Sequence, residues 1–172
     1  MGRFNRRRAL AIAGATATLA ACGTPAATVP PAPTDAHPLS GISTFDGTEL
    51  TPPSLVGKVT VVDFWASWCA PCRQGFKYLD QLFRTYQRDG LQVVGVCVDE
   101  DPKKGRAFRA RMRPRFDIAW DPSGSVRDRF RVVGLPTTLL LDEHARLVHR
   151  HEGFDVSLHR ILETHVRRLV RS

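Results

Sequence analysis

The stretch Trp68-Cys69-Ala70-Pro71-Cys72 decides how this chain is organised. It follows an apolar run at residues 59–65, which predicts a buried strand, and it precedes apolar residues at helical spacing. We therefore expect a strand-to-helix turn that carries two thiols about one helical turn apart. Sulfurs at that spacing can form and break a disulfide, so the stretch predicts reversible dithiol chemistry.

The two cysteines are expected to have different roles because they differ in position. Cys69 would lie beside unpaired backbone N–H groups at the helix start, where the helix dipole favours thiolate over thiol. It is the expected nucleophile, and Cys72 would resolve the mixed disulfide that Cys69 forms with a substrate. A structural disulfide is disfavoured because so short a loop restricts the unfolded chain little. A zinc site would need a second ligand pair, and the only cysteine downstream is Cys97.

Length and composition predict one domain with appendages. The chain has 172 residues and is 42% hydrophobic, enough for one substantial core. Its formal net charge is +8, but four arginines lie within the first eight residues, and without them about +4 remains. This balance does not favour a nucleic-acid partner.

Residues 1–21 have the pattern of an export signal. A basic start is followed by an apolar segment, residues 9–21, that is too short to span a bilayer as a helix. Leu19-Ala20-Ala21-Cys22 resembles the lipobox of bacterial lipoproteins, which implies that Cys22 is lipidated and becomes the mature N-terminus. The pair Arg7-Arg8 also resembles a twin-arginine signal. An uncleaved anchor helix is the alternative, and in either case the domain would be extracytoplasmic.

Residues 22–40 are rich in proline and alanine and are expected to form an extended tether that begins at the lipidated cysteine. Residues 41–172 are expected to form the folded domain. The pattern predicts an α/β fold, in which a central mixed sheet is flanked by helices and preceded by a short hairpin. The expected strands are residues 59–65, 91–98, 118–120, 137–141 and 146–151, and the hairpin covers residues 42–50. The helices are expected to start near residues 72, 102, 126 and 158, and Asp101-Pro102 is expected to supply the cap and first position of the second one.

Two motifs together resemble the thioredoxin superfamily. They are residues 63–72, which end in the two cysteines, and Gly134-Leu135-Pro136-Thr137-Thr138. More narrowly, they are similar to the TlpA-like thiol-disulfide reductases, and residues 94–101 also match a stretch typical of that exported branch. The resemblance implies a thioredoxin-like fold in which Pro136 is a cis proline facing the thiols. Proline has no N–H group, so the backbone of Leu135 would pair with an extended substrate, and Trp68 is expected to contact substrate as well.

Asp63 places a carboxylate in an apolar run, which is costly unless the group is paired or protonated. The resemblance implies that it lies beneath the second cysteine, so we assign it as proton acceptor or relay for Cys72. A hydrogen-bonded structural acid is the alternative. Gly75 and Lys77 stand where TlpA-like proteins commonly have an acid and a proline, which leaves the reduction potential open.

The expected function is that of a membrane-tethered thiol-disulfide oxidoreductase that reduces disulfides of exported proteins, such as apocytochromes or copper-site assembly proteins. Outside the cytosol a reductant needs an electron source, so we expect a membrane donor such as a thiol-disulfide interchange protein. No cofactor and no resident metal are expected. A copper metallochaperone using the same thiols is the main alternative. A thiol peroxidase is disfavoured because the cysteines form a vicinal pair.

Three further features are assigned structural roles. Cys97 is expected to be a small core residue, and a third redox thiol is the alternative. His149 and His151, with His144 nearby, could bind copper, but a solvated strand edge is preferred. The seven basic residues between positions 103 and 115 are expected to form a solvated helix face, which on a tethered protein could touch anionic headgroups or an acidic partner.

Overall fold

A computed structural model describes residues 37–171 and contains one six-stranded mixed sheet in the order β1-β4-β3-β2-β5-β6. The strands are β1 (Ser43–Thr44), β2 (Val59–Trp65), β3 (Leu91–Cys97), β4 (Asp117–Trp120), β5 (Thr137–Leu141) and β6 (Leu147–Glu152). The helices are α1 (Pro52–Leu55), α2 (Cys72–Tyr86), α3 (Pro102–Met112), α4 (Ser125–Arg129) and α5 (Val156–Leu169), and the 3₁₀ helix η1 (Gln87–Asp89) follows α2. The expected α/β fold with a mixed sheet is confirmed.

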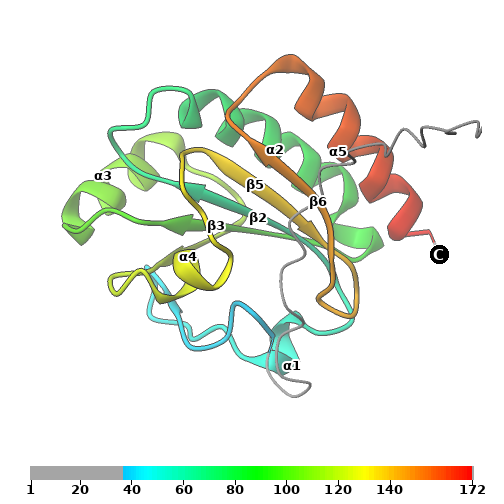
Figure 1. The fold of residues 1–172 in the computed structure, drawn as a ribbon, viewed down its shortest axis with the longest axis horizontal. Coiled ribbons are helices and arrows are strands. Elements are labelled where there is room, and N and C mark those ends of the chain that lie inside the picture. Colours follow the sequence, from blue (N-terminus) through cyan, green and yellow to red (C-terminus); the bar gives the residue numbers. More distant parts are fainter. Residues whose placement is uncertain (1–36, 172) are drawn as a thin grey trace, which may run out of the picture.

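Helices cover both faces of the sheet (Figure 1). Helices α2, α3 and α5 bury Phe76, Phe108 and Leu162 in one core cluster with Val61 and Trp65 of β2. Short helices α1 and α4 contribute to a second cluster on the opposite face, which contains the alternate β2 side chains, Val62 and Phe64. Because successive strand residues point to opposite faces, the continuous apolar run of β2 supplies both clusters.

Strand β2 lies at the centre of the sheet and positions the cysteine motif. It pairs in parallel with β3 and antiparallel with β5, and all seven of its residues are buried. In this register Asp63 lies between Gly95 of β3 and Thr138 of β5. The motif therefore leaves the sheet at the carboxyl end of a central, fully buried strand, as the sequence predicted.

Gly95 makes room for the large ring of Trp65. A Cβ atom at this position would lie 2.7 Å from Cδ1 of Ile118 and 3.1 Å from Nε1 of Trp65. The indole packs against Phe76 and Phe108 with ring-centroid distances of 4.9 and 4.7 Å. A glycine in a buried strand thus marks a close approach of packed side chains.

The ends of the helices follow local signals, with one difference. Asp101 caps α3, since its carboxylate accepts from the N–H of Lys103 at 2.9 Å, and proline occupies the first helical position as predicted. Gly90 ends the segment after α2 in a left-handed conformation with φ of 96°. Helix α2 begins only at Cys72, so Cys69 lies in the preceding turn and not in the first helical turn.

The N-terminal hairpin belongs to the sheet, which corrects the expectation that it merely precedes the core. Strand β1 pairs with β4, and the N–H of Phe45 donates to the carbonyl of Ile118 at 2.9 Å. Two of the basic α3 side chains hold the hairpin: Arg109 forms a bidentate ion pair with Asp46, and Arg106 donates to the Phe45 carbonyl. These two cations are therefore structural and are not part of a purely solvated face.

Candidate active site

Cys69 and Cys72 form a disulfide with a Cα–Cα distance of 5.4 Å. The N–H of Cys69 donates to the carbonyl of Ala66 at 3.1 Å, which closes the turn between β2 and α2. Cys69 is 4% exposed and Cys72 is fully buried, whereas Trp68 is 70% exposed. The redox pair therefore lies just below the surface, and the indole of Trp68 extends above it.

A groove of about 550 Å³ joins the loop that contains Trp68 to the loop before β5. Gly134 and Leu135 line it from the β5 side, and the peptide bond between Leu135 and Pro136 is cis. Val133, which is 87% exposed, also lines this groove. The structure thus brings Trp68 and the segment next to Pro136 together, and their contact with substrate remains a prediction.

Asp63 is a buried carboxylate on the α2 side of the sheet. Its side chain points to the same face of β2 as Val61 and Trp65, the residues two positions before and after it. Both of these residues belong to the same core cluster as Cys72. The hydroxyl of Thr138 donates to Oδ1 of Asp63 at 2.8 Å, while Oδ2 is buried and has no hydrogen-bond partner among the described residues. Asp63 is only 2% exposed.

Burial raises the pKa of Asp63 to about 7, although the hydrogen bond from Thr138 acts in the opposite direction. A carboxyl group with a pKa near neutrality can both accept and return a proton under physiological conditions. This is the property that the relay assigned to Asp63 requires. The proton transfer itself remains a prediction.

Asp99 is a site residue to which the sequence assigned no role. It follows β3, is 3% exposed, and contacts Ser67, two residues before Cys69. It also lines the groove beside Trp68. The only sequence signal was its place in residues 94–101, the stretch typical of TlpA-like proteins, because its partner lies 32 positions away in the chain.

Cys97 is buried in β3, as expected for a core residue. Its thiol donates to Oδ2 of Asp99 at 3.4 Å. Burial is the main cause that raises the pKa of Cys97 to about 12. The side chain is therefore a neutral thiol near pH 7, which makes it a poor nucleophile.

The histidines of β6 do not form the solvated edge that we expected. His149 and His151 are half-buried, and their ring centroids lie 6.4 Å apart. The ring of His149 stacks on His165 of α5 at 5.5 Å, so α5 covers this face of the strand. Burial, followed by the two neighbouring histidines, lowers the pKa of His149.

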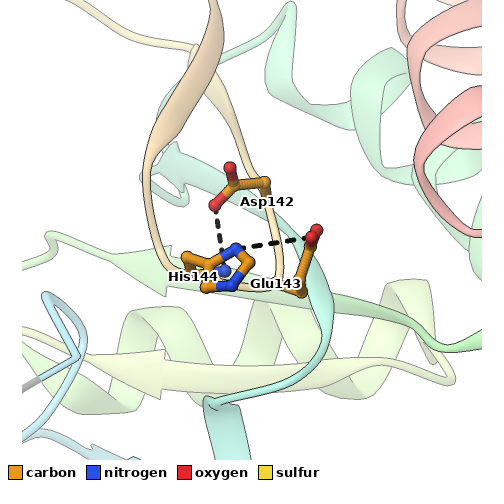
Figure 2. A group of neighbouring side chains, drawn as sticks. All are labelled: Asp142, Glu143 and His144. Carbon is orange, nitrogen blue, oxygen red and sulfur yellow. Dashed lines mark hydrogen bonds and ion pairs between the residues drawn. The ribbon is translucent and has the colours of Figure 1, made fainter. Parts of the chain in front are cut away.

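Among residues 37–171, one cluster has ligand-atom spacing compatible with a cation, namely Asp142, Glu143 and His144 in the turn between β5 and β6 (Figure 2). The Asp142 carboxylate already accepts from the N–H groups of His144 and Arg146, each at 2.9 Å, and from Nε of Arg146 at 2.7 Å. These contacts describe an aspartate that stabilises its own turn, so the geometry gives the cluster a structural role.

The lipidation site Cys22, the segment assigned as signal and residues 22–36 of the expected tether lie outside the described residues. The last residues assigned to the tether pack with the domain instead, since His37 is 4% exposed and Leu39 is fully buried in the core cluster on the α1 and α4 side of the sheet. Within residues 37–171, no helix has the length and apolar character needed to cross a bilayer.

Comparisons with known proteins agree with this geometry. The model of the AhpC/TSA family matches residues 31–150. Thiol-disulfide oxidoreductase ResA of Bacillus thuringiensis subsp. konkukian is 24% identical over 112 residues, which cover 65% of each chain. ResA of Geobacillus thermodenitrificans is 30% identical over 106 residues, 62% of this chain and 61% of the relative. The chain thus matches slightly less than two thirds of the length of these curated relatives.

A solved structure extends the similarity over more of the chain. A protein of Chlorobium tepidum, described as a thiol:disulfide interchange protein of the DsbE type, is 31% identical and superposes with a TM-score of 0.74. The superposition covers 80% of this chain and 96% of that protein. The expected thioredoxin-like fold is therefore confirmed. The chain belongs to the AhpC/TSA family, among its thioredoxin-like thiol-disulfide oxidoreductases of the ResA and DsbE type.

Proposed function

We propose that this protein is an extracytoplasmic thiol-disulfide oxidoreductase that reduces disulfides in exported proteins. The observation that carries the proposal is the Cys69–Cys72 disulfide, which closes the turn between the central strand and α2 beside a groove. Relatives named thiol-disulfide oxidoreductases support the same reaction class. The narrower TlpA-type role, with apocytochromes or copper-site assembly proteins as substrates, belongs to this proposal.

The reaction begins with the reduced pair. The thiolate of Cys69 attacks one sulfur of the substrate disulfide, a mixed disulfide forms, and the other substrate sulfur leaves as a thiolate that takes up a proton. Cys72 then gives its proton to the Asp63 carboxylate and attacks the Cys69 sulfur. This step expels the second substrate sulfur as a thiolate, which takes up a proton as the first one did, and leaves the Cys69–Cys72 disulfide. Two electrons have then passed from the protein to the substrate.

The substrate is expected to lie in the groove between Trp68 and Leu135. The exposed indole and the apolar side chains of Val133 and Leu135 offer surface to an unfolded segment around a disulfide. Backbone groups of Leu135 would pair with that segment in the manner of an added strand. Recognition of this kind depends little on the substrate's side chains.

The location and partners of the protein form a second part of the proposal. The resemblance of residues 19–22 to a lipobox supports lipidation of Cys22, and the proline-rich segment after it would hold the domain away from the membrane surface. In an oxidising compartment the disulfide must be reduced again, so a membrane thiol-disulfide interchange protein is the expected electron donor. Mass spectrometry of the protein isolated from membranes tests the anchor: an intact Met1 or an unmodified Cys22 would contradict it.

Single-cysteine variants test the reaction. The reduced wild-type protein should reduce insulin disulfides, C69S should be inactive, and C72S should accumulate a mixed disulfide between Cys69 and the substrate that mass spectrometry detects. D63N should form the mixed disulfide at the wild-type rate but resolve it more slowly. Unchanged resolution in D63N would refute the proton transfer to Asp63.

The alternative functions give different outcomes in the same preparation. Binding of Cu(I) by the reduced protein without any thiol exchange would favour a copper metallochaperone. Rapid consumption of hydrogen peroxide without insulin reduction would favour a thiol peroxidase. Either result would replace the proposed reductase function.

A further inference from the structure

We propose that Asp99 is a positioning residue that fixes the segment before Cys69 and, through its charge, makes the Cys69–Cys72 pair a stronger reductant. The inference rests on the proposed thiol-disulfide exchange and names a residue that tunes it. Asp99 is 3% exposed and lies in the loop between β3 and α3.

The carboxylate of Asp99 accepts hydrogen bonds from three groups. The N–H of Ser67 lies 3.2 Å from Oδ1 and 3.0 Å from Oδ2, and the Ser67 hydroxyl donates to Oδ1 at 3.1 Å. The thiol of Cys97 donates to Oδ2 at 3.4 Å. A backbone amide is always a donor, and a neutral thiol and a hydroxyl donate here as well. This arrangement suits an ionised carboxylate, which accepts at both oxygens and has no proton to place.

The backbone of the loop that carries Asp99 is held by two hydrogen bonds. The indole Nε1 of Trp120 donates to the Asp99 carbonyl at 2.8 Å. The preceding residue, Val98, donates its N–H to the carbonyl of Trp65 at 3.0 Å, which ties this loop to the end of β2. The carboxylate therefore holds the segment two residues before Cys69 in one position.

The negative charge of Asp99 is expected to disfavour the thiolate form of the cysteines. A buried negative charge near a cysteine disfavours the thiolate, whereas the N-terminal end of α2 favours it. Within residues 37–171, none of the ion pairs includes Asp99. Lys104 and Arg127 line the same groove as Asp99. Their positive charges reduce the field of the Asp99 carboxylate, although neither forms an ion pair with it. A less stable thiolate makes the reduced form less stable relative to the disulfide, so the pair gives up its electrons more readily.

The exchange equilibrium with glutathione measures this effect. Glutathione disulfide oxidises the reduced pair to the Cys69–Cys72 disulfide, two electrons pass to it, and two molecules of glutathione are formed. The full-length protein is equilibrated in glutathione buffers at pH 7, quenched with acid and alkylated. The dithiol fraction is then read by mass spectrometry on the tryptic peptide covering residues 59–73, which contains Cys69 and Cys72 but no other cysteine.

We expect D99N to lower the equilibrium constant for oxidation about tenfold, which corresponds to a potential about 30 mV less reducing. Asparagine keeps one acceptor oxygen for Ser67 but removes the charge. D99S also removes the charge, and it replaces D99N if that variant shows no cooperative unfolding transition. The absorbance of the thiolate at 240 nm, followed against pH, should show a lower pKa for Cys69 in the neutral variant.

Two controls separate charge from a general loss of structure. Asp121 is also 3% exposed and accepts from the N–H of Arg127 at 2.8 Å, but it does not contact Ser67, so D121N should stay within threefold of the wild-type constant. S67A removes one donor and leaves the charge, and it should also stay within threefold.

The proposal is overturned if the neutral Asp99 variants stay within threefold of wild type, or if D121N or S67A shifts the constant as far as they do. These results would leave the thiol exchange itself intact. If the wild-type pair does not exchange with glutathione at all, the proposed function fails first.

Discussion

Asp63→Asn should stabilise the folded protein at neutral and alkaline pH. The pKa of Asp63 is raised from 3.8 to about 7 in the fold, mainly because the group is buried. Below pH 3.8 the folded and unfolded chains both carry the protonated acid, so its burial costs nothing extra. As the pH rises from 3.8 to 7, the unfolded chain loses this proton first, and the free energy of unfolding falls.

The size of this effect follows from the two pKa values. Each pKa unit corresponds to 1.36 kcal/mol, so the ionised form of Asp63 costs up to about 4 kcal/mol above pH 7. Asparagine has nearly the same shape, and its carbonyl oxygen can still accept from Thr138. We therefore expect the free energy of unfolding of D63N to exceed that of the wild type by up to about 4 kcal/mol at pH 8. Near pH 4 the two proteins should differ little.

Urea unfolding of the oxidised protein at several pH values between 4 and 8 measures this difference. Asp142 provides a matched control because its carboxylate is also largely buried. Burial alone would raise the pKa of Asp142, but hydrogen bonds from Arg146 and His144 outweigh it and lower the pKa. D142N should therefore lose stability at pH 8. Equal stability of D63N and wild type at pH 8, or a gain that does not depend on pH, would refute the reasoning.

Three further predictions concern other buried groups. Burial lowers the pKa of His37 to about 4, so protonation of the unfolded chain should reduce stability as the pH falls from 6.5 to 4. H37N should retain about 3 kcal/mol more stability at pH 4 than the wild type, and identical acid-unfolding curves of the two proteins would contradict this. Gly95→Ala should lower the free energy of unfolding by about 1–3 kcal/mol in urea titrations, because its Cβ would meet Ile118; an unchanged midpoint would contradict the packing. Cys97 should react with iodoacetamide only after unfolding, as peptide mapping can test, and rapid labelling of the native protein would contradict its burial.

The parts of the fold that the sequence predicted are those set by local signals. Strand β2 was predicted because its apolar run is continuous, and α3 because Asp101 and Pro102 mark a helix start. The cysteine pair was predicted from spacing alone and forms the expected disulfide. The family resemblance, and not the residue pattern, was what implied the cis bond before Pro136.

The features that were missed depend on contacts between distant segments. The hairpin at residues 42–50 joins the sheet because β4 is available at its edge, which a local pattern does not reveal. His149 and His151 share one face of a strand, and nothing in their local sequence shows that α5 returns to cover that face. Asp99 accepts hydrogen bonds from Ser67, which lies 32 positions earlier in the chain. In each case tertiary packing, and not local propensity, decides the environment of the side chain.

Gly75 occupies a position at which TlpA-like proteins commonly have an acid. An added Cβ at Gly75 would lie 3.5 Å from the ring of Phe154, so a longer side chain would have to share space with that ring. The buried acids of the site are Asp63, on the α2 side of the sheet, and Asp99, beside Ser67. We propose separate roles for them, with Asp63 accepting the proton of Cys72 and Asp99 tuning the reduction potential.

The reduction potential of the Cys69–Cys72 pair tests the central claim most directly. Equilibration with glutathione at pH 7 gives this value, and known dithiol proteins span roughly −270 mV for thioredoxin to about −120 mV for a strong oxidant. A protein that reduces disulfides of exported proteins should have a potential more negative than about −200 mV. A value near −120 mV would contradict the reductase and make the protein a donor of disulfides.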